Sequence, residues 1–402
     1  MSKCEPRMYP QEHQSRPRMV GLGVLAGFAL AIAGTSHAAS MVTSVQTSNI
    51  PATAFTYTLG GIEYQWGMGN NQIMEGFTAD GLSFSYATSA DNVAIFRDDI
   101  VGVTTGEPCG IFVERLSESD TSRQFAADYP SDGSGTGNCD FSAMLASRVI
   151  NRGALDVFSN VLPDAKNIER LDYLFDFGVL APLSAEALNL AGHVVSEKSG
   201  NNPLQIAAIL EVDVLGQPAA YGPLLLVGAS GCAAPEQCYG ITDLQHVFSF
   251  LQNDFTQPQS FPEETERSQE SVGMAFISTA ALGLESGQRY YGFSLFADDV
   301  TTTTHDLLDP TTFPDDTSDD FIVPGDDADV YGGLSGYFFA DQLSVTAGAV
   351  FIDVNGDGIP SDSEAGISDI TIALFEDVNG NGLIDDGEDL QVGDSIAVSI
   401  HI

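Results

Sequence analysis

Residues 205–210 read Gln-Ile-Ala-Ala-Ile-Leu, and residues 290–296 read Tyr-Tyr-Gly-Phe-Ser-Leu-Phe. Both are short runs rich in β-branched, aliphatic and aromatic residues, the composition typical of strands. Similar runs recur between turns of Gly, Asp, Ser and Thr, for example at 55–59, 92–96 and 110–113. Many short strands bounded by turn residues indicate a sandwich or jelly roll. The sequence therefore predicts a mainly β fold, with residues 39–340 forming one large β-sandwich or jelly-roll-like domain.

A helix is suggested in one region of this domain. In the stretch from Leu155 to Phe175, Leu155, Phe158, Val161 and Leu162 follow helical spacing, and Pro163 interrupts the pattern. We therefore expect a strand-rich domain with one or two small helices.

The charge of the chain excludes several classes of partner. Its 402 residues include 14 Lys and Arg against 56 Asp and Glu, a formal net charge of −42. Nucleic-acid binding needs basic patches, so we expect no nucleic-acid partner, and the charge also disfavours anionic lipid surfaces. Hydrophobic residues make up 43% of the chain, enough to form a core rather than a disordered acidic tail.

The first 38 residues have the layout of a secretory signal peptide. Lys3 and three arginines precede the apolar run Met19 to Ala33, and small residues follow at Ser36 and Ala38. The run is shorter than the roughly 20 residues of a spanning helix. We therefore predict cleavage after Ala38, no transmembrane segment in the mature chain, and a secreted, extracellular or cell-surface location.

Four cysteines remain after this cleavage, an even number that suits an oxidising compartment. Four cysteines allow three pairings. The most local pairing joins Cys109 to Cys139 and Cys232 to Cys238, and we favour it over the other two.

An aspartate-rich stretch covers residues 298–329 and contains no Lys or Arg. It is interpreted either as a solvated loop over the domain surface or as a low-affinity calcium surface. Residues 341–347 are expected to be a linker, followed by a separate module at 348–402.

The strongest motif of the chain lies at 353–364. Oxygen ligands fall at positions 1, 3 and 5, a glycine (Gly358) at the sharp turn, a backbone carbonyl at position 7 and a carboxylate at position 12. This is the arrangement of oxygens that Ca²⁺ requires from one short loop. The predicted ligands are Asp353, Asn355, Asp357, Ile359 and Glu364.

The same pattern recurs at 377–388, with Gly382 at the turn. Two matches, each with its glycine, favour bound Ca²⁺ over metal-free Asx turns. The predicted ligands of this second loop are Asp377, Asn379, Asn381, Leu383, Asp385 and Glu388.

The segments that flank these loops have the pattern of strands. Ile370, Ile372 and Leu374 alternate with smaller or polar residues, which is a period of two. The residues between Glu364 and Asp377 are too few for two helices and a connection, so we expect the calcium loops to join β-strands rather than the helices of an EF-hand.

Residues 348–390, from Gly348-Ala-Val-Phe-Ile-Asp353 through the second loop, resemble the SdrD-type B domain of serine-aspartate-repeat surface proteins. This family belongs to the collagen-adhesin B-like group. The resemblance implies a calcium-stabilised β-sandwich that acts as a stalk or spacer in adhesins, and it implies nothing about 39–340.

The chain departs from that family in two respects. It stops at Ile402 without the usual closing hairpin, so the module at 348–402 is expected to be an incomplete copy. No lysine follows Lys198, which excludes within this module the Lys–Asn crosslink of some relatives. A dockerin-like scaffold component is a competing interpretation, although dockerin loops run into helices.

No catalytic motif is found in residues 39–340. Gly228-Ala-Ser230-Gly-Cys232 fails the G-x-S-x-G pattern at its last position. Trp66 could line a sugar site but is expected in the core. His193 and His246 are expected to be structural or exposed.

Together these features predict a secreted or cell-surface, calcium-binding structural or adhesin-like protein. Its partner would be an extracellular matrix, cell-surface or polysaccharide ligand. The alternative is a secreted, glycosidase-like hydrolase with an accessory calcium module, which predicts a cleft that holds two carboxylates at about 5–10 Å.

Overall fold

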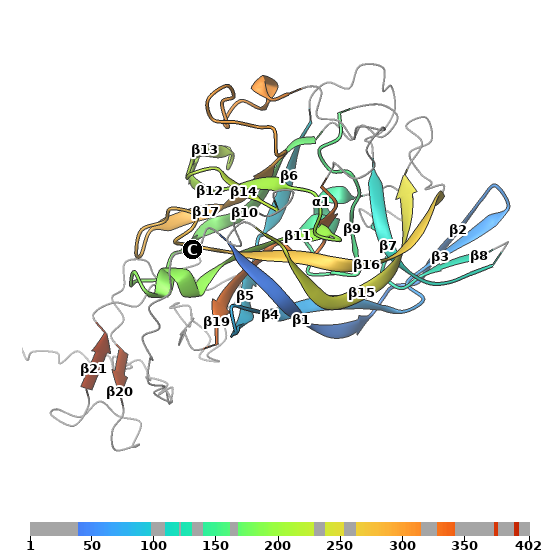
Figure 1. Cartoon of the computed structure of the whole chain (residues 1–402), viewed down its shortest axis with the longest axis horizontal. Helices are drawn as coiled ribbons and strands as arrows, with labels where there is room; N and C mark the ends of the chain where they lie inside the picture. Colours follow the sequence, from blue (N-terminus) through green and yellow to red (C-terminus); the bar gives the residue numbers. More distant parts are fainter. Residues whose placement is uncertain are drawn as a thin grey trace, which may run out of the picture. The chain divides into compact units, whose positions relative to one another are not determined.

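The computed structural model describes ten stretches of the chain, in which 58% of the structure is β-strand and 6% is helix (Figure 1). These stretches are residues 39–97, 109–119, 122–130, 140–160, 168–228, 238–252, 263–314, 328–341, 374–376 and 390–393. The prediction of a mainly β, sandwich-like protein is confirmed.

The larger sheet follows the strand order β1-β4-β5-β19-β11-β16-β15-β7-β8-β3-β2, with β9 and β18 attached to it through β7. Within this sheet β3 pairs with β8 in parallel, and the other described pairs are antiparallel. Its strands are β1 (Ser40–Pro51), β2 (Phe55–Leu59), β3 (Ile62–Trp66), β4 (Asn70–Ala79), β5 (Leu82–Ser89), β7 (Gly110–Ser119), β8 (Ser122–Phe125), β9 (Arg152–Ala154), β11 (Ala191–Lys198), β15 (Gly240–Gln252), β16 (Glu263–Ser278), β18 (Val330–Tyr331) and β19 (Gly336–Ala340).

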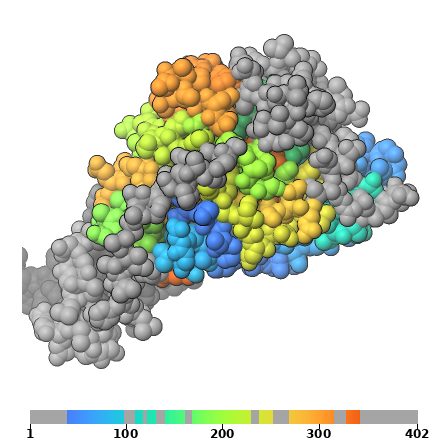
Figure 2. Space-filling model, in the orientation of Figure 1, coloured from blue at the N-terminus to red at the C-terminus, as the bar shows by residue number. Residues whose placement is uncertain are grey.

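Part of this sheet closes on itself. β1 pairs with β4 on one side, and Ser40 and Met41 pair with Phe276 and Ala275 of β16. The antiparallel pairs β4–β5, β5–β19, β19–β11 and β11–β16 complete a ring of strands. Figure 2 shows the consequence, since blue atoms of the N-terminal strands lie directly beside yellow atoms of β15 and β16. Strands from opposite ends of the domain therefore share one barrel-like wall, in which hydrogen-bonding edges are satisfied.

The smaller sheet has the order β13-β12-β17-β10-β6, with β14 paired to β12. Its strands are β6 (Asn92–Arg97), β10 (Ile168–Leu180), β12 (Leu204–Val212), β13 (Pro218–Tyr221), β14 (Leu225–Val227) and β17 (Arg289–Phe296). This sheet contacts the larger one through aromatic rings: His193 of β11 lies 4.6 Å from Phe293 of β17, centroid to centroid. The two sheets enclose a continuous apolar core.

The strand runs quoted from the sequence all form strands, as β2, β6, β7, β12 and β17. The expectation of a strand-rich domain with one or two small helices is confirmed, but the place suggested for a helix is wrong where it is described; residues 161–167, which include Val161, Leu162 and Pro163, lie outside the described part. Leu155 to Asn160 form turns, and Ile168–Leu180 is the strand β10, whose first eight residues are buried. Burial on both faces removes the polar alternation that would have marked a strand. The α-helix of the described part is instead α1 (Phe141–Ala146), which Asp140 caps by accepting a hydrogen bond from the backbone N–H of Ala143.

The chain divides into two compact units, with residues 39–341 in one and the short strands β20 (Leu374–Glu376) and β21 (Leu390–Gly393) in the other. β20 and β21 form a two-stranded antiparallel sheet. Among the described residues, no helix has the length and apolar character needed to span a membrane.

Candidate functional site

The two predicted calcium loops lie outside the described residues. This holds for every predicted ligand of the first loop, Asp353, Asn355, Asp357, Ile359 and Glu364. It also holds for every predicted ligand of the second, Asp377, Asn379, Asn381, Leu383, Asp385 and Glu388. The coordination of an ion in either loop therefore stays a prediction.

The flanks of the second loop, however, are described. β20 ends at Glu376, one residue before Asp377, and β21 begins at Leu390, two residues after Glu388. Glu376 is paired with Leu390 in the antiparallel register. The segment 377–388 thus connects the two strands of a hairpin, as expected from the sequence, and not the two helices of an EF-hand or a dockerin.

The described part of the aspartate-rich stretch uses its carboxylates in turns. Asp306 Oδ1 accepts a hydrogen bond from the N–H of Leu308 at 3.0 Å, and Asp309 Oδ1 accepts one from the hydroxyl of Thr311 at 2.7 Å. Within the described ranges, no group of three or more His, Cys, Asp or Glu is arranged to hold a metal ion. Both interpretations of the stretch 298–329, the solvated loop and the calcium surface, stay predictions. Residues 315–327 lie outside the described part.

His193 is a structural residue at the junction of the two sheets. Its Nδ1 lies 2.9 Å from the carbonyl oxygen of Gly336, and its Nε2 lies 2.7 Å from the hydroxyl of Tyr290. Because a carbonyl can only accept, Nδ1 carries the proton and Nε2 accepts from Tyr290. Complete burial lowers the pKa of His193 to about 4, so the ring is neutral at physiological pH.

His246 of β15 is also buried, and its Nε2 lies 3.0 Å from Oε1 of Gln72 on β4. Burial lowers the pKa of His246, against the opposing effect of Glu114. Trp66 is fully buried and packs against Phe125 and Tyr129, at 4.6 and 5.0 Å between centroids. Trp66 is therefore a core residue, as the sequence favoured, and not the lining of a sugar site.

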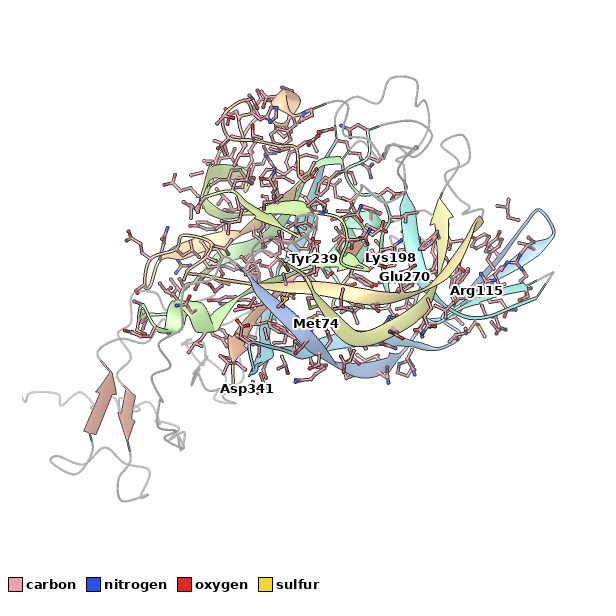
Figure 3. All side chains as sticks on the ribbon, viewed as in Figure 1. Met74, Arg115, Lys198, Tyr239, Glu270 and Asp341 are labelled. Atoms are coloured by element: carbon pink, nitrogen blue, oxygen red, sulfur yellow. The ribbon has the colours of Figure 1, made fainter. Side chains whose placement is uncertain are left out.

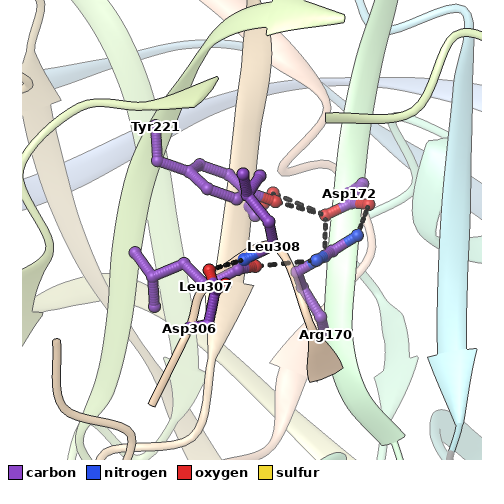
Figure 4. A network of polar contacts seen from close by, with 7 residues as sticks. Arg170, Asp172, Tyr221, Asp306, Leu307 and Leu308 are labelled. Carbon is purple, nitrogen blue, oxygen red and sulfur yellow. Dashed lines mark hydrogen bonds and ion pairs between the residues drawn. The ribbon is translucent and has the colours of Figure 1, made fainter. Parts of the chain in front are cut away.

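Two polar clusters inside the domain escaped the sequence analysis. The first joins Arg170 and Asp172 of β10 to Ser294 of β17 and Tyr221 of β13 (Figure 4). The guanidinium of Arg170 also donates to the carbonyl oxygen of Leu307 at 2.8 Å. The cluster fixes the loop after β17 over the smaller sheet.

The second cluster centres on Lys198, at the end of β11. Its Nζ lies 2.8 Å from Oδ2 of Asp329, just before β18, and 4.2 Å from the ring centre of Phe250. Glu197, 1% exposed, lies beside this pair. Burial and then repulsion from Asp329 raise the pKa of Glu197 well above its ordinary value. Glu270 also acts electrostatically on Lys198, and both residues are labelled in Figure 3.

One signal in the sequence could have singled out this second cluster. Lys166 and Lys198 are the lysines that remain after residue 38. A chain that keeps so few lysines and places one in a partly buried ion pair uses it for a specific contact, since lysines withdrawn from water are rare unless paired.

Cys109 and Cys238 are both disulfide-bonded. Residues 139 and 232 lie outside the described part, so the favoured pairing of Cys109 with Cys139 and of Cys232 with Cys238 stays a prediction.

No protein-family model, curated protein or solved structure matches this chain. Its fold and buried clusters define a mainly β, sandwich-like protein. A function for it has to come from its own residues and their geometry.

Proposed function

We propose that the chain is a secreted or cell-surface, calcium-binding structural protein of the adhesin type. In this proposal residues 39–340 form the β-sandwich body, and the module at 348–402 is a calcium-stabilised spacer. The observation that carries the proposal is the β20–β21 hairpin, because it supplies strand flanks on both sides of a complete calcium-ligand pattern. The SdrD-type B-domain resemblance points in the same direction.

The remaining parts of the proposal rest on the sequence. The signal-like segment 1–38 supports export, and the even number of later cysteines supports an oxidising exterior. The excess of carboxylates makes a matrix, cell-surface or polysaccharide partner more compatible than nucleic acid. Sequencing the N-terminus of the exported protein tests this part, with Ala39 as the expected first residue.

The hydrolase alternative gains no support from the described residues. Glu197 and Asp329 are neighbouring carboxylates, but both are buried, and Asp329 is engaged by Lys198. The dockerin alternative conflicts with the strand flanks of the second loop.

Protection against a glutamate-specific protease tests the spacer directly. Trypsin is unsuitable because no Lys or Arg follows Arg289, whereas Glu364, Glu376 and Glu388 all lie in or beside the loops. Calcium is expected to slow cleavage at these three sites strongly, and EGTA to restore it. Equal cleavage rates in both conditions would contradict the proposal. The control is cleavage at the glutamates of residues 39–341, which should not respond to calcium.

A further inference from the structure

The larger sheet ends in a strand with an open side. β2 is the last strand in the sheet order; it pairs with β3 on one side, and none of the other described strands pairs with its opposite side (Figure 1). Gly60 and Gly61 join β2 to β3, with φ of +59° and +85°. Two successive residues with positive φ are typical of the type I′ turn of a two-residue hairpin. This turn fixes which backbone groups of β2 point toward β3.

The backbone groups of two threonines point away from the sheet. The residues on either side of a two-residue turn form a hydrogen-bonded pair, and such pairs recur at every second residue. Leu59 and Ile62 are that pair here. β2 therefore directs the N–H and C=O of Leu59, and of every second residue before it, toward β3. Those of Thr56 and Thr58 face the open side, and the side chains of both threonines are exposed.

The edges of the smaller sheet carry residues that hinder pairing with another chain, whereas β2 does not. At one edge β13 begins with Pro218, which has no N–H to donate, and at the other edge β6 ends with Arg97. Proline and charge are common means of protecting an exposed strand. β2 contains neither. Residues 40–62 contain no charged side chain at all, although charged residues make up 17% of the chain.

The apolar face of β2 is only partly covered. Phe55, Tyr57 and Leu59 share this face and pack against the core, yet each stays partly exposed. The ring of Tyr57 stacks on that of Tyr64 of β3 at 4.9 Å between centroids, and the ring of Tyr64 lies 6.4 Å from that of Phe125 of β8. A row of aromatic rings thus runs across three strands and stops at the open edge. One more strand beside β2 would continue this row and bury its end.

We propose that β2 is the contact surface of a homodimer, in which β2 of a second copy of this chain pairs with it in antiparallel register about Tyr57. Thr56 then pairs with the partner's Thr58, and each such pair exchanges both of its N–H···O=C bonds. Tyr57 and the partner's Tyr57 meet at a pair without hydrogen bonds, where Cα atoms are about 4.5 Å apart and side chains lie closest. Antiparallel pairing of a strand with its own copy satisfies the two-fold symmetry of a closed dimer.

The charge of the chain favours a contact of this kind between copies. The formal net charge is −42, so two copies repel one another over most of their surfaces. The uncharged stretch 40–62 lets two acidic chains approach at β2 without placing like charges opposite each other.

The dimer is expected to be weak. A five-residue strand buries far less than the roughly 1,200–2,000 Å² of a stable protein interface. We therefore expect a Kd between about 1 μM and 1 mM. The pairing does not involve the C-terminal module, so it can hold or fail separately from the proposed function.

Sedimentation equilibrium of the full-length exported chain, in EGTA and at concentrations up to about 1 mM, tests the dimer. The chelator removes any contribution of calcium. The expected result is a reversible equilibrium between monomer and dimer. A chain that stays monomeric over the whole range would overturn the proposal and leave the edge to a strand of another protein.

A proline at the edge separates β2 from other possible contacts. Thr56→Pro removes an outward N–H but no hydrogen bond to β3, so the circular-dichroism spectrum of the fold should be retained. Its Kd should rise by about tenfold or more. Ala219→Glu, at an exposed position of the edge strand β13, is the control and should leave the Kd unchanged. A wild-type Kd in Thr56→Pro would place the contact elsewhere and contradict the proposal.

Two double variants test the register. Thr56→Lys combined with Thr58→Lys places like charges opposite each other in the proposed pairs, and the dimer should be lost. Thr56→Glu combined with Thr58→Lys places opposite charges there, and the dimer should form with a Kd no higher than that of the wild type. The same Kd in both double variants would reject antiparallel pairing about Tyr57.

Discussion

Arg170 and Asp172 form a bidentate ion pair inside the smaller sheet, with Nε to Oδ1 at 2.8 Å and Nη2 to Oδ2 at 3.0 Å. They lie two residues apart on β10, and residues i and i+2 of a strand share a face. The hydroxyl of Ser294 also donates to Asp172. Two buried charges are thus satisfied by one another and by neighbours from other strands.

Removing the carboxylate of Asp172 should lower the stability of the fold. Asp172→Ala leaves the guanidinium of Arg170 buried without its counter-ion, which typically lowers the free energy of unfolding by about 3–5 kcal/mol. Tyr221→Phe removes a single hydroxyl from the same cluster and should cost about 1 kcal/mol. Urea denaturation of both variants measures the difference. Equal losses would show that the ion pair is not buried as described.

His193 should make stability depend on pH between about 4 and 6.5. Burial depresses its folded pKa to about 4 from an ordinary value of 6.5, so the unfolded chain binds the proton more strongly. Stability is therefore complete above pH 6.5 and is lost as the pH falls toward 4. From pH 7.5 to pH 5 the loss due to this residue is about 2 kcal/mol.

Urea denaturation at several pH values, on the wild type and on His193→Gln, measures this contribution. The variant should lose less stability on acidification than the wild type. If the free energy of unfolding changed with pH by the same amount in the wild type and in His193→Gln, the assignment of a neutral, hydrogen-bonded ring would be contradicted.

Two glycines with positive φ should differ sharply in their tolerance of alanine. Gly292 has a φ of +126°, and a Cβ there would overlap the carbonyl oxygen of Tyr173. Gly216 has a φ of +77° with nothing within 4 Å of a built Cβ. Gly216→Ala should cost about 1 kcal/mol from backbone strain alone. Gly292→Ala should cost several times more, because the paired strand β10 must move. Thermal melts of both variants measure the two losses of stability. A larger loss in Gly216→Ala than in Gly292→Ala would contradict the described register.

The pairing of the four cysteines can be determined from the disulfide-linked peptides in a digest of the non-reduced protein. We expect Cys109 linked to Cys139 and Cys232 linked to Cys238. Because the first pair closes the longer loop, its removal should cost more stability, about 3–4 kcal/mol in the chain-entropy description. A peptide that links Cys109 to Cys232 or Cys238 would reject the pairing.

Local sequence patterns were sufficient for the strands but not for their arrangement. Runs such as 205–210 and 290–296 form β12 and β17 because they are β-branched and aromatic. The pairing of Ser40 with Phe276 depends on contacts between residues far apart in sequence, and no local pattern encodes it. The helix expected near Leu155 was wrong because Leu155, Val157 and Phe158 are all buried in a bend and turn after β9, so their spacing reflects the packing of a turn and not one face of a helix.

The candidate sites show the same contrast between local sequence patterns and contacts between distant segments. The calcium loops are visible in the sequence because their ligands are contiguous and obey a fixed spacing. The site of Lys198, Asp329 and Asp156 is assembled from three distant segments, so spacing cannot reveal it. Only the scarcity of lysine after residue 38 marked Lys198 as unusual.

Calorimetric titration of the chelator-stripped, full-length exported chain with Ca²⁺ shows whether the two loops bind the ion. We expect saturable binding at two sites. Asp353→Ala and Asp377→Ala should each remove one site, and Asp369→Asn, a carboxylate outside both loops, should remove none. At a hundredfold excess of Ca²⁺ over Kd, each site should stabilise the module by about 2.7 kcal/mol. Absence of saturable heat, or the same stoichiometry in wild type, Asp353→Ala and Asp377→Ala, would contradict the assignment of a calcium-stabilised module.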